Sequence, residues 1–220
     1  MLQQILQKLI LAMAVTNPPL LFSQLYKLDW YSGILREWIA GLDLTPKSKI
    51  LELGSGPGNL SADLANMNYR VIGADKSARM IAYASKLETN AKFIQADALN
   101  LPMEDNEFDA VLLASLINLV PDRALLLKEI SRVLKPGGTI SVLFPTPAFD
   151  RNSALQYANK HQLGQRSRAA LCVWASVAKQ LNAADIVAEF SKAGFKNVSS
   201  SLHLENNIAS VKAIKVKSIK

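Results

Sequence analysis

The sequence has little of the two residue types that build disulfides and zinc sites. Its 220 residues include one cysteine, Cys172, and two histidines, His161 and His203. A single cysteine excludes an internal disulfide, and so few histidines and cysteines argue against a metal centre. We therefore expect no metal in the site. We also expect Cys172, which stands between Leu171 and Val173, to lie in the core.

The sequence also lacks a long hydrophobic run, because no apolar stretch approaches the roughly 20 residues that cross a bilayer. The apolar N-terminus places Leu2, Ile5, Leu6, Leu9 and Met13 at helical spacing, with polar residues between them. This spacing predicts an amphipathic helix and not a signal-peptide core. We expect a cytoplasmic protein whose first helix is a lid or a homodimer contact, in preference to a peripheral membrane contact.

Acidic residues are scarce in the last third of the chain. Residues 1–150 carry 14 Lys and Arg against 15 Asp and Glu, whereas residues 151–220 carry 11 against 3, and the net charge is +7. Such asymmetry fits an acidic ligand, an anionic membrane surface or nucleic acid. It fits a solvated lysine-rich strand and tail equally well.

Apolar runs of strand length alternate with helical patterns over the middle of the chain. This alternation predicts a parallel sheet with helices on both faces. We expect a turn at residues 136–138, strands at 50–53, 70–74, 91–95, 108–114 and 139–144, and helices at 59–66, 77–87 and 122–134.

Helical segments flank this core on both sides. Residues 1–45 are expected to form an N-terminal helical cap, with helices at 2–15 and 20–42 and a break near Gly33. Residues 46–220 are expected to form the main domain. A mainly helical insertion at about 145–183 interrupts the domain, which then closes with a helix at 183–193 and strands at 196–204 and 207–216.

Three glycines, Gly54, Gly56 and Gly58, follow the first predicted strand and open a helix. Glycines let the backbone turn tightly and approach a ligand closely. Their G-x-G-x-G spacing differs from the G-x-G-x-x-G of dinucleotide-binding proteins. Glu52 stands two residues earlier in an otherwise apolar strand. Its charge there requires a cationic ligand group or loop amides, unless the carboxylate only holds the loop.

Two more acids follow the next two strands. Asp75 is placed where an acid binds the hydroxyls of a ribose, or else caps a helix, a role that Ser77 can also fill. Asp97 can accept a hydrogen bond from an exocyclic amine such as that of adenine. The carboxyl ends of parallel strands meet at one edge. Glu52, Asp75 and Asp97 therefore define a crevice that suits adenosine and an amino-acid cation and repels a diphosphate.

These segments resemble the motifs of class I S-adenosylmethionine-dependent methyltransferases, in the subgroup of ubiquinone and menaquinone methyltransferases. The first motif is matched by Leu51–Ser61, and the subgroup signature by Gln95–Pro102 with Asp105–Val111. The late motif is matched by Leu127–Ile130 with Arg132–Gly138. The resemblance covers about residues 46–145 in the right order.

The resemblance implies an α/β, Rossmann-like, seven-stranded sheet of order 3-2-1-4-5-7-6 with strand 7 antiparallel. It also implies S-adenosyl-L-methionine as cofactor, with S-adenosyl-L-homocysteine as the product. The glycine turn would lie against the methionine part, Asp75 on the ribose, and Asp97 with Ala98 on adenine. The implied cofactor-binding residues are Glu52, Gly54, Ser55, Gly56, Gly58, Asp75, Lys76, Met80, Asp97, Ala98, Leu99, Ala114 and Ser115.

The sequence leaves the catalytic residues open. The family often carries a histidine after the fourth strand, where this chain has Asn118, and an amide is not a base near neutral pH. Tyr26 or Tyr31 is a candidate to lie over the cofactor, as a tyrosine does in relatives, with ordinary aromatic packing as the alternative. His161 in the insertion is a candidate base, with a surface position as the alternative.

The leading hypothesis is an enzyme that transfers a methyl group from S-adenosylmethionine to a small-molecule acceptor, acidic or aromatic, by in-line displacement. One alternative is a protein that binds S-adenosylmethionine or S-adenosylhomocysteine without catalysis. Another is a protein or nucleic-acid methyltransferase, although a nucleic-acid partner is disfavoured. A nicotinamide-dependent oxidoreductase is argued against by the glycine spacing. The sequence determines neither the acceptor nor the oligomeric state.

Overall fold

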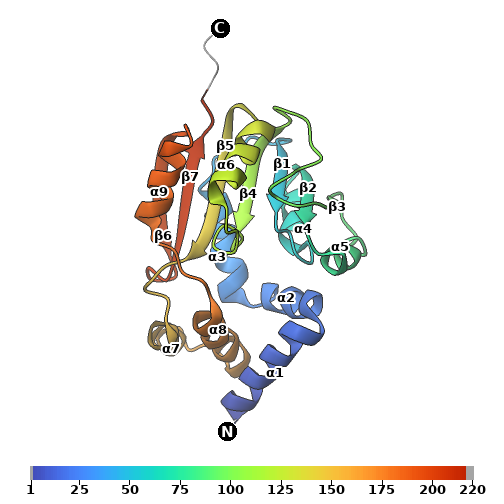
Figure 1. The fold of residues 1–220 in the computed structure, drawn as a ribbon. Coiled ribbons are helices and arrows are strands. Elements are labelled where there is room, and N and C mark those ends of the chain that lie inside the picture. The colour runs from blue at the N-terminus through green and yellow to red at the C-terminus, as the bar shows by residue number, and fades with distance from the viewer. Residues whose placement is uncertain (1, 217–220) are drawn as a thin grey trace.

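The computed structural model describes residues 2–216, in which a twisted sheet is flanked by helices (Figure 1). Its seven strands lie in the order β3-β2-β1-β4-β5-β7-β6. The pairs from β3 to β5 are parallel, whereas β7 is antiparallel to both β5 and β6. The predicted fold class is therefore confirmed. The strands are β1 Lys49–Leu53, β2 Arg70–Asp75, β3 Lys92–Gln95, β4 Phe108–Ala114, β5 Leu134–Pro145, β6 Lys196–His203 and β7 Ile208–Ile214.

Helices bury both faces of the sheet. Ile50 of β1 belongs to a core that includes residues of α3 and α4, whereas its neighbour Leu51 belongs to the opposite core with residues of α6 and α9. This alternation is what a strand covered on both faces requires. The helices are α1 Leu2–Thr16, α2 Pro18–Tyr26, α3 Asp29–Ala40, α4 Asn59–Asn66, α5 Ala78–Ala84, α6 Arg123–Val133, α7 Arg151–Lys160, α8 Gln165–Val177 and α9 Ala183–Lys192.

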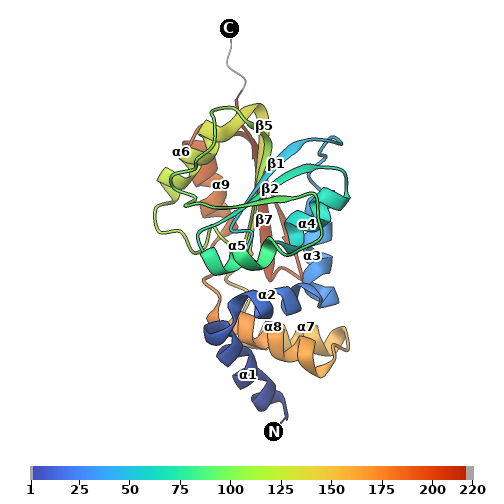
Figure 2. The same cartoon turned by 90° about the vertical axis from the view of Figure 1, so that its right-hand side faces the viewer.

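Four helices from distant parts of the chain lie together at one end of the molecule. We call α1, α2, α7 and α8 the end layer; both ribbon views show it at the end opposite the C-terminus (Figures 1 and 2). α1 packs against α8 and α2. The helix α3 joins this layer to the sheet, because Trp38 Nε1 donates to the buried Ser141 Oγ of β5 at 2.8 Å.

Two sequence-based expectations about local structure were wrong. The second helix breaks at Lys27 and Leu28 and not at Gly33, which lies inside α3. Leu28 has an extended backbone there, and the Lys27 amide closes α2 on the carbonyls of its last turn. The expected turn at residues 136–138 lies within β5. The pairing with β4 jumps from Phe108–Leu134 to Ala110–Thr139, so the extra residues form an irregularity in the strand.

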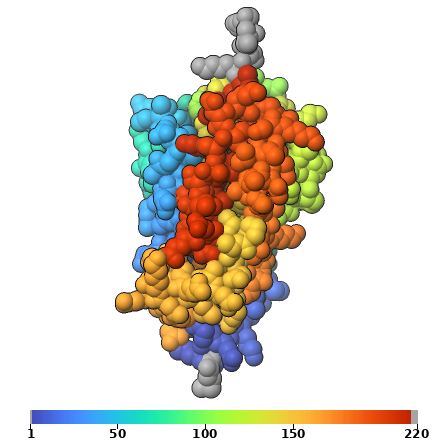
Figure 3. Space-filling view, turned by 90° about the vertical axis from the view of Figure 1, so that its left-hand side faces the viewer, coloured from blue at the N-terminus to red at the C-terminus, as the bar shows by residue number. Residues whose placement is uncertain are grey.

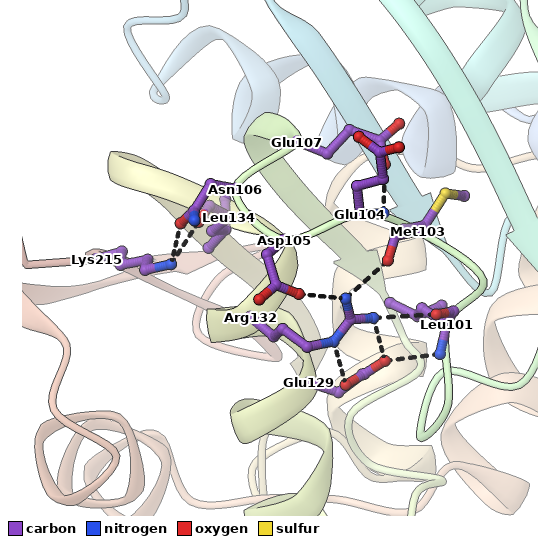
Figure 4. A network of polar contacts seen from close by, with 10 residues as sticks. All are labelled: Leu101, Met103, Glu104, Asp105, Asn106, Glu107, Glu129, Arg132, Leu134 and Lys215. Atoms are coloured by element: carbon purple, nitrogen blue, oxygen red, sulfur yellow. Dashed lines mark hydrogen bonds and ion pairs between the residues drawn. The ribbon is translucent and has the colours of Figure 1, made fainter.

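A polar network centred on Arg132 fixes the connection between β3 and β4 (Figure 4). Its guanidinium donates to the backbone oxygens of Met103 and Leu101 at 2.7 and 3.0 Å and to the carboxylate of Asp105. Glu129, one turn earlier on α6, accepts from Arg132 and from the Leu101 amide. The segment before β4 is thereby held against α6 at the amino edge of the sheet, where Glu107 pairs with Lys49 at the start of β1.

Candidate active site

The turn after β1 places three glycines at the carboxyl end of the sheet. Gly54 N and Ser55 N both donate to the Ala74 oxygen of β2, at 2.8 and 3.1 Å. Gly54, Gly56 and Gly58 have φ of 70°, 53° and 85°. Only glycine adopts this region without strain, so the path of the turn depends on these residues. Its amides all have partners within the chain, because Gly56 N donates to Asp75 and Gly58 N donates to Ser55 O. What the turn offers a ligand is therefore close approach to its backbone at the edge of the sheet.

Glu52 is a buried carboxyl directly before this turn. It is 3% exposed, and Ser61 of α4 donates its hydroxyl to Oε2. Burial raises the pKa of Glu52 to about 8; the charge of Asp75 adds to the rise and the Ser61 hydrogen bond opposes it. The carboxyl is thus mostly protonated near neutral pH, and a cation placed beside it would favour the ionised form.

Asp75 joins the end of β2 to the glycine turn. Its Oδ2 accepts from Gly56 N at 2.9 Å, and its Oδ1 accepts from Ser77 N at 2.8 Å. Ser77 itself caps α5 by accepting from the Met80 amide. Two amides therefore orient the Asp75 carboxylate, and each oxygen retains a lone pair for a ligand hydroxyl.

Asp97 follows β3 and is oriented in a similar way. Its Oδ1 accepts from Leu99 N at 3.0 Å, and its Oδ2 pairs with Lys76 Nζ at 2.8 Å. The Lys76 hydrogen bond, followed by that of Leu99, lowers the pKa of Asp97. The Lys76 side chain is 81% exposed. An ion pair this exposed is weak, so Lys76 can swing aside when a ligand approaches Asp97.

Two adjoining cavities of about 250 and 270 Å³ lie over these acids. Gly54, Asp75, Leu116 and Leu119 line both, so the two form one groove along the carboxyl edge. The first cavity extends towards α2 and α3, and the second extends along the end of β3. A long ligand that crosses Asp75 would occupy both.

Unpartnered polar atoms lie in the first cavity. The Ser55 hydroxyl and the Asn59 side-chain oxygen are buried and have no hydrogen-bond partner among residues 2–216. Buried polar groups normally have partners. Both atoms adjoin the glycine turn near Glu52, so a polar, partly cationic ligand segment would satisfy them.

Residues 51–142 match the family model described as a methyltransferase domain. This stretch of the chain is therefore similar to a methyltransferase domain. The motif resemblance predicted this family, and the match confirms it.

The relatives and solved structures that resemble this methyltransferase domain agree with that assignment. Demethylmenaquinone methyltransferase of Corynebacterium urealyticum is 43% identical over 108 residues, 48% of this chain and 46% of the relative. The ubiquinone/menaquinone biosynthesis C-methyltransferase UbiE of Haemophilus ducreyi is 37% identical over 117 residues, 49% of this chain and 45% of the relative. The chain thus spans about half the length of the curated relatives it matches.

A solved structure extends the likeness over most of the fold. A SAM-dependent methyltransferase from Aquifex aeolicus has a TM-score of 0.65 and 17% identity, and the match covers 90% of this chain and 98% of that one. At this identity the likeness establishes the fold alone. The end layer lies outside residues 51–142, the part of the chain that matches the methyltransferase domain.

Within the methyltransferase domain, the structure brings the predicted cofactor-binding residues together with one exception. All of them except Gly58 line one of the two cavities. Gly58 lies beneath the turn, where an added Cβ would meet Phe93 and Ala84 at 2.7 and 2.8 Å. Packing and a positive φ account for this glycine, and its predicted contact with the cofactor stays a prediction. Sequence reasoning did not identify the lining residues Phe22, Leu35, Leu53, Pro57, Asn59, Leu60, Ala74, Ala96, Leu116, Leu119, Val120 and Pro121.

Both candidate tyrosines line the first cavity. The Tyr26 hydroxyl donates to the Asp63 carboxylate of α4, and burial, followed by this hydrogen bond, raises the pKa of Tyr26. Burial and the nearby Glu52 raise the pKa of Tyr31 to about 12. Both hydroxyls are therefore neutral near pH 7. They can donate hydrogen bonds, but they do not act as ready bases.

The structure does not bring the candidate base His161 to the cavities. Its Nε2 lies 3.1 Å from Glu205 Oε1, and its ring stacks on Tyr157. Asn118 is buried and donates to the Lys179 oxygen at 3.0 Å, which ties the loop after β4 to the segment after α8. His203, to which the sequence assigned no role, is a buried structural residue between Glu37 and Ser210.

A larger hollow than these two cavities lies elsewhere. It is an open groove of about 960 Å³ between α6 and α9, and the Arg123–Glu189 ion pair lies in it. None of Glu52, Asp75 and Asp97 lines it. The smaller pair of cavities is the candidate site because the oriented acids and the unpartnered polar atoms converge there. Residues 2–216 also contain no group of three metal-ligating side chains.

Proposed function

We propose that this protein transfers a methyl group from S-adenosylmethionine to a small aromatic acceptor. One observation carries the proposal. Three carboxyl groups, each at the end of a neighbouring parallel strand, surround a glycine turn beneath a continuous two-part groove. The domain match and the names of the relatives support it.

The groove offers a distinct partner for each part of the cofactor. Asp97 and the backbone at Ala98 suit adenine, and Asp75 suits the two ribose hydroxyls. The Glu52 carboxyl and the unpartnered Ser55 and Asn59 oxygens suit the amino-acid end. A ligand with a diphosphate in place of that end would meet a carboxyl where it needs donors.

The acceptor would enter from the end layer. The wall of the first cavity on that side is apolar and aromatic, with Phe22, Tyr26, Tyr31, Leu35 and Leu119. Such a wall fits a planar ring, and the Tyr31 hydroxyl can donate a hydrogen bond to a ring oxygen, since that of Tyr26 is donated to Asp63. The relatives named for menaquinone and ubiquinone biosynthesis suggest a quinone precursor as the first acceptor to test.

The protein contributes positioning and water exclusion more than acid–base chemistry. When bound, S-adenosylmethionine supplies a methyl group already activated by positive sulfur. Ala114 and Ser115 at the end of β4 line the groove between the glycine turn and the aromatic wall, where donor and acceptor would meet. Tyr31 donates a hydrogen bond that orients the acceptor, and the apolar wall excludes water.

Turnover with labelled S-adenosylmethionine tests this proposal. Purified protein is mixed with the tritiated methyl donor and, in separate reactions, with a quinol precursor, simple phenols, carboxylic acids and amines. Label transferred to a ring compound supports the proposal, and Tyr31→Phe is expected to lower kcat about tenfold or more, whereas Tyr157→Phe, beside His161, leaves it unchanged. Tight cofactor binding without transfer to any acceptor would favour a binding protein without catalysis.

A further inference from the structure

α1 in the end layer is apolar on both sides, because Ile10 packs against the core while other apolar side chains point outwards. Leu2, Ile5 and Leu9 lie on one stripe of the helix and each is about half exposed. The opposite stripe faces α8, and there Gln3 and Gln7 bury side-chain atoms that have no hydrogen-bond partner among the described residues. Burying unpaired amides costs free energy, and exposed apolar side chains on the other side of the same helix mark a surface that a partner can cover.

Further exposed apolar side chains lie at the end of α1, on α2 and in the loop after β4. Val15 at the end of α1 is 80% exposed, and Phe22 of α2 and Leu119 of the loop after β4 are about half exposed. Phe22 and Leu119 also line the first cavity. Exposed apolar side chains are thus found both on the N-terminal helix and at the mouth of the candidate active site.

The net charge of the protein is concentrated in the same layer. Residues 1–28 and 151–184, which include all of α1, α2, α7 and α8, carry seven Lys and Arg and no Asp or Glu. The rest of the chain carries 18 of each sign, so these two segments hold the whole net charge of +7. The seven residues are Lys8, Lys27, Arg151, Lys160, Arg166, Arg168 and Lys179.

These charges are mostly free to interact with a partner. Of the seven, only Lys160 is in a salt bridge within residues 2–216, and its partner is Glu205. The space-filling view shows α7 and α1 together forming the lower end of the molecule (Figure 3). Exposed leucines and isoleucine beside unpaired cations are the composition of an interfacial membrane-binding surface.

We propose that the end layer docks on an anionic lipid surface, with the apolar stripe of α1 entering the headgroup boundary and the cations contacting lipid phosphates. Nucleic acid would match the charge but leave the leucines in water. A second copy would cover the leucines but bring seven like charges per subunit together. A lipid surface satisfies both features. Docking would turn the mouth of the groove towards the membrane, where an apolar acceptor is concentrated. No helix within residues 2–216 is long and apolar enough to span a bilayer, so the contact would be peripheral.

Vesicle sedimentation of the full chain tests this docking surface without any methyl acceptor. The probes are phosphatidylcholine vesicles with and without about one third phosphatidylglycerol. We expect binding to the anionic vesicles that is at least about tenfold stronger than to the neutral ones and that weakens as salt is raised.

Two sets of variants separate the apolar from the electrostatic part. The pair Ile5→Gln with Leu9→Gln, and the triple change Lys27→Gln, Arg166→Gln and Lys179→Gln, should each weaken vesicle binding about tenfold or more. The matched controls are Met67→Gln, another half-exposed apolar residue, and Lys92→Gln with Lys196→Gln on strands outside the end layer. The controls should leave binding unchanged.

Several results would overturn the proposal. These are no binding to anionic vesicles at low salt, equal binding to neutral vesicles, displacement of the protein from vesicles by duplex DNA, or a stable dimer in which α1 is protected and vesicles are not bound. Retained affinity for S-adenosylhomocysteine and an unchanged melting temperature show that each variant is folded. Because vesicle binding is read without turnover, its failure is distinguishable from failure of the proposed methyl transfer.

Discussion

Gly56 N donates to Asp75 Oδ2 at 2.9 Å, so the glycine turn after β1 and the acid that ends β2 are held together before any ligand arrives. Replacing Asp75 with Ala removes this bond and the predicted ribose contact together. We expect affinity for S-adenosylhomocysteine to fall at least about tenfold, as expected for the loss of a charge-assisted hydrogen bond. Isothermal titration calorimetry measures this affinity. Asp43→Ala, at an exposed acid far from the groove, is the control; equal loss in both variants would contradict the assignment.

Two alanine substitutions in the glycine turn should act on different properties: one mainly on stability and the other mainly on ligand binding. At Gly58 an added Cβ would meet the Phe93 ring at 2.7 Å, whereas at Gly56 it would meet nothing within 4 Å. Gly58→Ala should therefore destabilise the fold by about 2–4 kcal/mol. Gly56→Ala should cost about 1 kcal/mol for its φ and mainly weaken ligand binding. Chemical denaturation and calorimetry on both variants check this; a reversed order of stability would contradict the assigned packing.

Glu52 should make stability depend on pH. Its folded pKa of about 8 lies above the ordinary glutamate value of 4.5, so the folded state holds a proton that the unfolded state releases. The stability it contributes is full below about pH 4.5 and is lost as pH rises to about 8. Glu52→Gln should remove that dependence and be about 1–3 kcal/mol more stable than the wild type at pH 8. Urea denaturation at pH 5 and pH 8 measures the difference, and an equal pH dependence in both proteins would refute the buried-acid account.

The same carboxyl should link cofactor binding to proton release. A cationic amino-acid end favours ionised Glu52, so affinity for S-adenosylhomocysteine should rise between pH 6 and pH 8, by at most about tenfold per unit. In Glu52→Gln the affinity should be lower and nearly independent of pH. Calorimetry in buffers with different ionisation enthalpies counts the protons released. A wild type that releases none on binding at pH 7 would show that Glu52 does not meet the cation.

Replacing Asp97 should weaken cofactor binding more than replacing Lys76 does, although the two side chains form one ion pair. Asp97→Ala should weaken binding of the adenosine part about tenfold, because the carboxylate accepts from the ligand amine. Lys76→Ala should change the free energy of unfolding by less than about 1 kcal/mol, as an exposed pair contributes little, and should weaken the cofactor less than threefold. Binding of adenosine alone to each variant gives the comparison. Equal losses would indicate that Lys76, and not Asp97, recognises the base.

The sheet and its three acids were predictable because the signals are local. Glu52, Asp75 and Asp97 each follow or end an apolar run, and parallel strands bring such ends to one edge. The long β5 was harder. Pro136 to Gly138 are turn formers by composition, yet pairing of Leu134 with Phe108 keeps this segment in the sheet as an irregularity. Here long-range pairing overrides local propensity.

The acceptor side of the groove was not predictable in the same way. The sequence indicated Tyr26 and Tyr31, but the lining role of Phe22, Leu116 and Leu119 depends on how α2 and the loop after β4 meet in space. The orientation of α1 was also hidden. Helical spacing identified Leu2, Ile5, Leu6, Leu9 and Met13 as one face, and the usual expectation is that such a face turns inward. Here Leu6 and Met13 are half-buried, whereas Leu2, Ile5 and Leu9 are exposed.

Calorimetric titration of the wild-type chain with S-adenosylhomocysteine tests the central claim most directly. If the groove beneath Glu52, Asp75 and Asp97 holds this cofactor, a single site with a Kd between about 1 and 100 μM is expected, and Asp75→Ala should weaken it. If the folded protein shows no binding heat even when the ligand is raised to a few times the millimolar level, about 1 mM and above, the account is contradicted.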